Sequence, residues 1–337
     1  MIASNLIRVF SLTALSFLLA FLWTPLLSHF LYKYKISKQL RVNAWDGDPA
    51  KVFRKMHKHK SGVPTMGGVL VWVTAGIVTV FFNLSRSQTW LPVFVLATSG
   101  ILGLIDDFVN TRGASLVRGL STKIKFLFQF LIASLGAWWF YYKLGFSQIH
   151  IPAAQALGLP QVADIGVFYI PLFILTVVFL SNAVNITDGL DGLAGGTLAI
   201  SFGAVMALAL VQGQVGIAAF AGTIIGALLA FLWYNIHPAR FFMGDTGSFA
   251  LGATLAALAF LTNSVLLLPF VGFVFVVEAF SSLIQRFSKK YLGKKVFLIA
   301  PLHHHFEALG WPETKVTMRF WVIAAVMATI GLVIGLI

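Results

Sequence analysis

The sequence predicts an all-α membrane protein with about ten transmembrane helices. The chain has 337 residues, of which 58% are hydrophobic and only 10% are charged, whereas soluble globular domains carry about 25% charged residues. Its mean hydropathy is +0.89. The absence of cysteine excludes disulfides, thiol catalysis and zinc sites built from Cys. We expect one integral membrane domain that comprises residues 1–337.

Ten apolar runs are long enough to cross a bilayer, for which a helix needs roughly 17 to 25 residues. The first run is longer than the apolar part of a signal peptide and is followed by no convincing cleavage site, so we expect a retained span. Only Pro269 separates the eighth run from the ninth. The runs lie at 9–31, 66–83, 90–105, 124–142, 168–184, 197–212, 215–234, 249–268, 269–287 and 317–337.

The lysines and arginines predict the orientation, because cytoplasmic loops carry an excess of both. A loop at 33–60 holds nine of the 24, and other predicted loops on the same face hold all the rest except Arg8, Arg86 and Lys143. We therefore expect this face to be cytoplasmic and both termini to be extracytoplasmic. The net charge of +13 then reflects topology and contact with membrane lipids, and it requires no nucleic acid.

Aspartates gather at the ends of the predicted spans on this same face. In Asp106-Asp107 two adjacent carboxylates repel each other, and desolvation at a membrane edge disfavours their charge further unless a cation compensates. A solvated helix end is the simpler alternative. Oxygen ligands without Cys suit Mg²⁺ or Mn²⁺ better than zinc. The aspartates of this face are Asp106, Asp107, Asp188, Asp191 and Asp245.

The segment NAVNITDGLDGLAGG, 182–196, lies between two apolar runs. Because hydrocarbon offers its polar groups no hydrogen-bond partners, it must lie at a membrane edge or line a cavity. Asp188 and Asp191 would share a face of a helix, and the glycines allow a ligand to approach the backbone closely. The segment matches neither a dinucleotide fingerprint nor a phosphate-binding loop. A glycine-rich packing face is the alternative, but it leaves both aspartates unexplained.

The segment FFMGDTGSFALG, 241–252, covers the start of the eighth run. Free N–H groups at a helix start attract an anion such as phosphate, and Asp245 could equally cap the helix.

Two further segments carry basic groups on the predicted cytoplasmic face. In PLHHHFEALGW, 301–311, three consecutive histidines on a helix point about 100° apart and cannot all bind one metal. They suit phosphate binding or the orientation of a proton donor. HKSGVPTMGG, 59–68, places Lys60 and Thr65 at the membrane edge, although alone it indicates little more than a turn.

The chain resembles the MraY family of phospho-N-acetylmuramoyl-pentapeptide transferases in five segments. These are GVPTMGG (62–68), DD (106–107), NAVNITDGLDGLAGG (182–196), FMGDTGS (242–248) and APLHHHFEALGWPE (300–313). The aspartate motifs are shared by the whole superfamily of polyprenyl-phosphate N-acetylhexosamine-1-phosphate transferases. The histidine segment followed by GWPE is the more specific marker.

This resemblance implies transfer of phospho-MurNAc-pentapeptide from UDP-MurNAc-pentapeptide to undecaprenyl phosphate, which gives lipid I and UMP. It also implies dependence on Mg²⁺ and a site on the cytoplasmic side of a bacterial inner membrane. Homodimers are common in the family, but the sequence leaves the oligomeric state open. Asp106, Asp107 and Asp245 match the catalytic aspartates, with Asp245 and Asp106 as metal ligands, and we place His304 with them. The substrate-binding candidates are Lys60, Thr65, Lys123, Lys125, Asn182, Asn185, Asp188, Asp191, Asn235, Phe242, His303 and His305.

One position departs from the family pattern. The family usually has a lysine three residues after the second aspartate, and this chain has Asn110. We expect Lys123 or Lys125 to supply the missing charge, unless that charge is less needed than the pattern suggests.

For the mechanism we expect direct attack by the lipid phosphate after Asp106 takes its proton, with a phospho-aspartyl intermediate as the alternative. An apolar groove should lead the lipid to Asp106. The ninth run, with Pro269 and Gly272, is a candidate for a bent wall of that groove. For Glu278, in the same run, a structural hydrogen bond to a neighbouring helix is an alternative to a function.

Three rival functions are open to test. A sister enzyme that transfers GlcNAc-1-phosphate would share the aspartate motifs but should lack HHHFE-x-x-GWPE. A cation-coupled transporter would need acids near the middle of the bilayer in broken helices. An inactive scaffold would not need complete aspartate motifs.

Overall fold

A computed structural model describes residues 2–34, 36–37, 60, 62–85, 88–112, 119–154, 158 and 160–337. Several basic residues on which the orientation rests fall outside these ranges. They are Lys35, Lys38, Arg41, Lys51, Arg54, Lys55, Lys58, Arg86 and Arg118. His59, in the segment 59–68, also lies outside the described residues.

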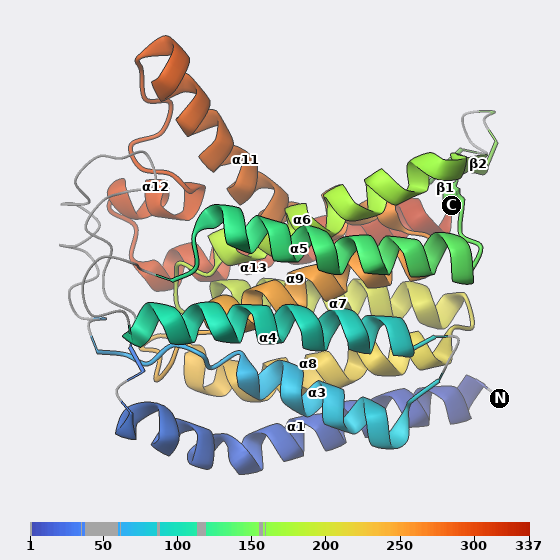
Figure 1. Ribbon diagram of the computed structural model, residues 1–337, viewed down its shortest axis with the longest axis horizontal. Helices are drawn as coiled ribbons and strands as arrows, with labels where there is room; N and C mark the ends of the chain where they lie inside the picture. The colour runs from blue at the N-terminus through green and yellow to red at the C-terminus, as the bar shows by residue number, and fades with distance from the viewer. Residues whose placement is uncertain are drawn as a thin grey trace.

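The protein is a bundle of long helices that lie roughly side by side (Figure 1). Among the described residues, eight helices are long and apolar enough to cross a membrane, and a bent pair makes a ninth. The shorter apolar helix α3 accounts for the remaining predicted run, so the all-α polytopic prediction is confirmed. The helices are α1 (Ile2–Lys33), α3 (Val69–Phe82), α4 (Trp90–Arg112), α5 (Thr122–Trp138), α6 (Tyr169–Thr187), α7 (Leu193–Val211), α8 (Val215–Asn235), α9 (Gly244–Leu261), α10 (Leu268–Val271), α11 (Phe273–Phe287), α12 (Leu302–Ala308) and α13 (Glu313–Leu336).

The expected boundary between the eighth and ninth spans, at Pro269, is wrong in position. Helix α9 already ends at Leu261, and Pro269 lies in the first turn of α10, where its missing N–H breaks no helical hydrogen bond. The break falls at Gly272 instead, where the helical segments on either side are bent by 82°. The bend expected in this run is therefore confirmed, and α11 projects away from the bundle (Figure 1).

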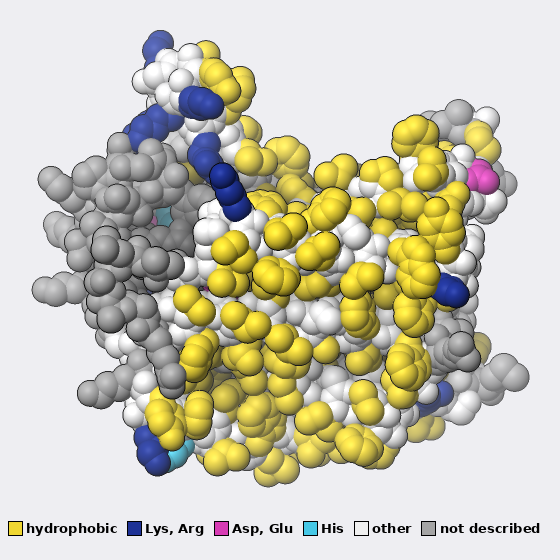
Figure 2. Space-filling view, viewed as in Figure 1, with side chains coloured by type: hydrophobic (Ala, Val, Ile, Leu, Met, Phe, Trp, Pro, Cys, Tyr) yellow, Lys and Arg dark blue, Asp and Glu magenta, His cyan; other side chains and the backbone are white. Residues whose placement is uncertain are grey.

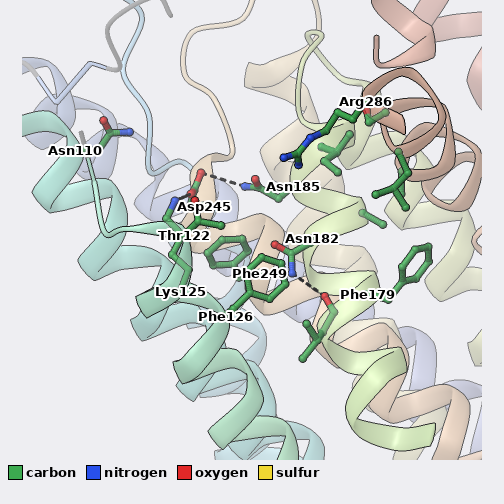
Figure 3. A pocket seen from close by; sticks show the side chains of 16 residues that line it. Asn110, Thr122, Lys125, Phe126, Phe179, Asn182, Asn185, Asp245, Phe249 and Arg286 are labelled. Atoms are coloured by element: carbon green, nitrogen blue, oxygen red, sulfur yellow. Dashed lines mark hydrogen bonds and ion pairs between the residues drawn. The ribbon is translucent and has the colours of Figure 1, made fainter. Parts of the chain in front are cut away.

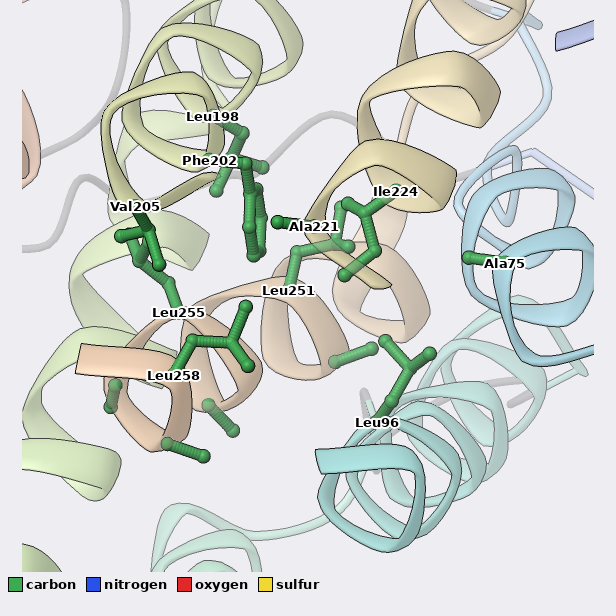
Figure 4. Close-up of a cluster of buried hydrophobic side chains, with 14 of the residues drawn as sticks. Ala75, Leu96, Leu198, Phe202, Val205, Ala221, Ile224, Leu251, Leu255 and Leu258 are labelled. Atoms are coloured by element: carbon green, nitrogen blue, oxygen red, sulfur yellow. The ribbon is translucent and has the colours of Figure 1, made fainter. Parts of the chain in front are cut away.

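Helix α9 is the centre of the bundle, because every residue of it is buried. Its Leu251, Leu255 and Leu258 pack against Phe202 and Val205 of α7 (Figure 4). Acyl chains are as apolar as leucine, so helices in a membrane associate through close packing rather than through a hydrophobic force. The position of α9 therefore depends on how closely its neighbours approach its backbone.

The outer surface and the two ends of the bundle complete the fold. Apolar side chains cover the side of the bundle seen in Figure 2, as expected for a surface in contact with lipid. Both termini lie at one end of the bundle and α12 lies at the other (Figure 1). A two-stranded antiparallel sheet, β1 (Gln148–His150) with β2 (Val162–Asp164), lies at the end with the termini; it was not predicted.

Candidate active site

A lysine joins two of the predicted aspartates where α4, α5 and α9 meet. Lys125 Nζ lies 2.6 Å from Asp106 Oδ2 and 3.1 Å from Asp245 Oδ2. Asp106 also accepts a hydrogen bond from the Leu120 N–H at 2.7 Å, and Asn185 Nδ2 donates to Asp245 Oδ1 at 3.0 Å. The side chains of Asp106 and Asp245 are at most 4% exposed. The chain thus holds two buried carboxylates on one ammonium group.

Two other aspartates hold the start of α9. The Gly244 N–H donates to Asp188 Oδ2 at 3.1 Å, and the Thr246 N–H donates to Asp107 Oδ2 at 3.0 Å. The expectation that N–H groups of this helix start bind a phosphate is therefore wrong for these two donors. The capping alternative for Asp245 is also wrong, because the residue lies within the first turn and its oxygens contact Lys125 and Asn185.

Asp188 and Asp191 do not share a helix face. Helix α6 ends at Thr187, and Gly192 has a φ of +75°, a conformation that glycine adopts without strain. The two side chains therefore contact different parts of the structure. Asp188 contacts the start of α9, and Asp191 belongs to a second cluster.

This second cluster is built around Asp191. Lys60 Nζ lies 2.8 Å from Asp191 Oδ1 and also contacts Glu313 Oε1. His237 Nδ1 lies 2.9 Å from Asp191 Oδ2, which also accepts the Ala239 N–H at 3.1 Å. Burial alone would raise the pKa of the Asp191 carboxyl, but the Lys60 ammonium and the hydrogen bonds to the carboxylate outweigh it and lower that pKa below its ordinary value.

The cluster makes stability depend on pH in a definite direction. Because the pKa of Asp191 is lower in the folded state than in the unfolded chain, its stabilisation is complete above the unfolded value of about 3.9. It is lost as the pH falls through the lowered folded value.

Replacing Lys60 with Met is expected to lower the free energy of unfolding at pH 7 by about 3–5 kcal/mol, because it leaves two buried carboxylates without their cation. The deficit should shrink as the pH falls and the carboxylates take up protons. Thermal unfolding of the detergent-solubilised protein at several pH values measures both effects. Lys123→Met, at an exposed lysine, is the control; an equal loss in both variants would contradict the prediction.

Of the substrate-binding candidates, Lys60, Asn235 and Phe242 lie around the second cluster, whereas Asn185 and Asp188 contact the start of α9. Lys60 Nζ lies 5.7 Å from the centre of the Phe242 ring, within the range of a cation–π contact. Asn235 is buried, and it accepts the Gly192 N–H at 3.0 Å and donates to the Phe241 carbonyl at 2.9 Å. The structure therefore gives Asn235 a role in joining two loops to the end of α8. Thr65 is buried as well, and a Cβ on Gly244 would lie 2.6 Å from its Oγ1.

The three histidines have different surroundings in α12. His303 is fully buried; its N–H donates to Glu278 Oε1 at 3.1 Å, and its Nδ1 lies 3.0 Å from Glu278 Oε2. Glu278 is thus hydrogen-bonded to a neighbouring helix. His304 Nδ1 lies 2.7 Å from Glu307 Oε2. His305 Nδ1 accepts the Leu298 N–H at 3.2 Å, outside the buried group.

One glycine connects the histidines to the aspartate segment. A Cβ on Gly189 would lie 2.3 Å from His303 Nε2, so the imidazole occupies the space beside this residue. The segments 182–196 and 301–311, predicted independently, are therefore in direct contact.

A pocket of about 370 Å³ lies beside the lysine–aspartate group (Figure 3). Its polar side chains include Lys125, Asn182, Asn185 and Asp245. Asp106 does not line it, so the groove expected to lead to Asp106 reaches that carboxylate only through Lys125. The apolar side chains of the pocket are Phe126, Val178, Phe179, Ala183, Ile186, Phe249, Ala279 and Leu283.

The structure also distinguishes between Lys123 and Lys125, the two candidates for supplying the charge that Asn110 lacks. Lys125 contacts two aspartates, whereas Lys123 is exposed and does not line the pocket. Asn110 itself lines the pocket.

Comparison with known proteins assigns the family. The profile described as glycosyl transferase family 4 matches residues 89–263. A phospho-N-acetylmuramoyl-pentapeptide-transferase of Chloroflexus aggregans is 40% identical over 346 aligned residues, which cover 100% of this chain and 92% of the relative. One of Geobacillus thermodenitrificans is 41% identical over 331 residues, covering 95% of this chain and 96% of the relative. The chain belongs to the phospho-N-acetylmuramoyl-pentapeptide-transferase family.

The residues at the lysine–aspartate group fit a divalent cation, which a transferase of this family would use. Asp106, Asp107, Asp188 and Asp245 place four carboxylates around the start of α9, against one described lysine, Lys125. Oxygen donors with an excess of negative charge are what Mg²⁺ prefers. Among the described residues, the group of three whose possible ligand atoms all lie within 4.8 Å of one another is instead Asp191, His237 and Glu313. There Lys60 already contacts both carboxylates, so a metal is less needed.

Sequence reasoning missed two residues of this transferase's second cluster, His237 and Glu313. Glu313 is the last residue of the segment 300–313, which was used only to identify the family resemblance, and no contact was predicted for it. A buried acid at a helix start could have been paired with Lys60 on grounds of charge. No comparable signal exists for His237, whose contact with Asp191 joins positions 46 residues apart.

Proposed function

We propose that this membrane protein transfers phospho-MurNAc-pentapeptide from UDP-MurNAc-pentapeptide to undecaprenyl phosphate, which yields lipid I and UMP. The observation that carries the proposal is Lys125, which joins Asp106 and Asp245 beside a pocket with apolar walls. A polyprenyl phosphate combines the two properties that such a pocket accommodates, a long apolar chain and an anionic head. The relatives of the same length carry the name of this activity.

In the proposed reaction a phosphate oxygen of the lipid attacks the sugar-linked phosphorus, and the bond from that phosphorus to the UMP oxygen breaks. Lys125 lines the pocket and its Nζ lies 2.6 Å from Asp106 Oδ2, so the Lys125 ammonium gives one of its protons to the Asp106 carboxylate and takes up the proton of the lipid phosphate in its place. Asn185 orients Asp245 through its hydrogen bond. Held by Asp245 and Asp106, Mg²⁺ would supply positive charge to the diphosphate.

The proposed location is the inner membrane of a bacterium, with both clusters at the cytoplasmic end of the bundle. The last turns of α4, the connection from α6 to α7, and α12 carry Asp106, Asp191 and His303 respectively, and all three segments lie away from the end that carries the termini (Figure 1). This gathering of acids at one end also argues against a transporter, which would need them near the middle of the bilayer.

UMP release tests the proposal. Purified protein with undecaprenyl phosphate and Mg²⁺ is expected to release UMP from UDP-MurNAc-pentapeptide and not from UDP-GlcNAc, and EDTA is expected to abolish the release. Release from UDP-GlcNAc alone would assign the chain to the sister activity. Exchange of labelled UMP into the UDP-sugar without any lipid would support a phospho-aspartyl intermediate and contradict direct attack.

A further inference from the structure

Two side chains of α11 hold the start of α12. Ser281 Oγ accepts the Leu302 N–H at 3.1 Å, and Glu278 Oε1 accepts the His303 N–H at 3.1 Å. Both N–H groups belong to the first turn of α12, where they have no partner within their own helix. The second oxygen of Glu278, Oε2, lies 3.0 Å from Nδ1 of the His303 ring. The carboxylate therefore contacts both the backbone and the ring of one residue.

Glu278 and His303 form a buried pair. Both side chains are fully buried, and neither lines the pocket beside Lys125. Among the described residues no lysine or arginine contacts the Glu278 carboxylate, so the N–H and the ring of His303 compensate its charge. A carboxylate offers only acceptors, which favours a proton on the ring nitrogen that faces it. A ring turned by 180° would place a carbon there and lose the attraction.

The other side of the His303 ring faces the aspartate segment 182–196. A Cβ on Gly189 would lie 2.3 Å from Nε2 and 3.1 Å from Cε1 of this ring. Neither ring nitrogen has a hydrogen bond of good geometry among the described residues. The charge of Glu278 on one side and the packing against Gly189 on the other therefore hold the ring in place.

Gly189 lies in the turn that connects the two clusters of the site. Asp188, the residue before it, accepts the Gly244 N–H at the start of α9. Asp191, two residues after it, contacts Lys60. A displacement of Gly189 would consequently move both carboxylates.

We propose that Glu278 is a positioning residue for the transfer: it orients the His303 ring, and the ring fixes the place of the turn that carries Asp188 and Asp191. This inference rests on the proposed function. It places His303 behind the site rather than in contact with substrate, since the side chain is fully buried. The turn must be held closely, because misplacement of a reacting group by about 1 Å can reduce the rate about 100-fold.

Steady-state kinetics of Glu278→Gln test the inference. The amide keeps the shape of the side chain and an oxygen that can accept the His303 N–H, but it removes the charge beside Nδ1. We expect kcat to fall and KM for the nucleotide sugar to rise, each about 10- to 100-fold. The KM for undecaprenyl phosphate should stay unchanged, because Glu278 does not line the pocket. Glu278→Asp keeps the charge and should recover part of both effects, whereas normal kinetics in Glu278→Gln would overturn the inference.

Ser281→Ala is the matched control, because it removes the neighbouring bond from α11 to α12 and leaves the His303 ring in place. This variant should unfold at a lower temperature and keep the KM for the nucleotide sugar unchanged. An equal rise of that KM in Ser281→Ala and Glu278→Gln would mean that Glu278 only attaches α12, which would refute its role in orienting the ring.

The contact between the ring and Gly189 is tested by stability alone. In the wild type, the methyl group of Gly189→Ala would overlap the His303 ring, so the unfolding temperature should fall. In a His303→Ser background the ring is gone, and the same Gly189→Ala change should lower the unfolding temperature much less. Equal effects of Gly189→Ala in both backgrounds would contradict the contact and, with it, the path from Glu278 to the turn.

A spectroscopic measurement separates this inference from the proposed function. Nitrogen NMR of histidine-labelled protein reports which ring nitrogen carries the proton, and the His303 signals are identified by their loss in His303→Gln. The wild type should carry the proton on Nδ1, and Glu278→Gln should lose this preference. If the wild type releases no UMP but shows this difference, the proposed function fails and the orientation of His303 by Glu278 stands. Identical His303 signals in the wild type and Glu278→Gln would overturn the inference.

Discussion

Replacing Asp106 with Asn is expected to lower kcat by about 100- to 10,000-fold, the range for loss of a group that accepts a proton in the reaction. The amide keeps the shape of the side chain and an oxygen that can accept the Leu120 N–H, but it has no charge to hold Lys125. UMP release at saturating lipid and nucleotide sugar measures the effect. The unfolding temperature should change much less than the rate.

The neighbouring aspartate provides the contrast. Asp107 Oδ2 accepts the Thr246 N–H at the start of α9, so Asp107→Asn should act first on the stability of that helix start. A large loss of stability in Asp106→Asn together with an intact fold and a lost rate in Asp107→Asn would reverse the two assignments.

Replacing Gly103 with Ala is expected to reduce both stability and activity. A Cβ at Gly103 would lie 2.2 Å from the Asp245 carbonyl oxygen and 2.5 Å from Thr246 Cα. Both contacts are with backbone, so α4 and α9 must move apart, at a cost of about 1–3 kcal/mol. That movement would carry Asp245 away from Lys125. Misplacement of a reacting group by about 1 Å can reduce the rate about 100-fold.

Gly76→Ala is the matched control, because Gly76 also lies within a helix, α3, and no described heavy atom apart from its chain neighbours and the backbone of its own helix lies within 4 Å of the added methyl group. There Ala should raise the free energy of unfolding by about 0.4–1 kcal/mol, since it restricts the unfolded chain. The two glycine variants are thus expected to differ in sign. Unfolding temperatures and UMP release for both proteins measure this; a tolerated Gly103→Ala would contradict the close packing of α4 on α9.

The helices were predictable because a bilayer leaves the backbone few alternatives. Each apolar run must satisfy its own N–H and C=O groups, so its length and composition alone indicate a helix. The run at 269–287 shows the limit of this reasoning. Composition does not reveal that α9 ends at Leu261 or that the chain bends at Gly272, because both follow from packing against neighbouring helices.

The site was predictable in its residue types and less so in its geometry. Lys123 and Lys125 lie on the same helix about 200° apart around its axis, so only the packing of α5 decides which one contacts Asp106. The pairing of Asp188 and Asp191 failed for a local reason, because α6 ends before either residue. The contacts of Lys60 with Glu313 join residues 253 positions apart, and no local pattern encodes them.

Because one side of the pocket is apolar and exposed, a lipid that binds there does so at a rate set by its concentration within the membrane, not by its concentration in the bulk solution. Phe126 and Leu283, on α5 and α11, line the pocket and are 46% and 52% exposed, so in a membrane they face acyl chains. Helix α11 leaves the bundle at the 82° bend (Figure 1). A lipid arriving from this side diffuses in two dimensions within one leaflet. Adding inert phospholipid then slows its encounters even when its bulk concentration is constant, and rates are comparable only at equal mole fraction of acceptor.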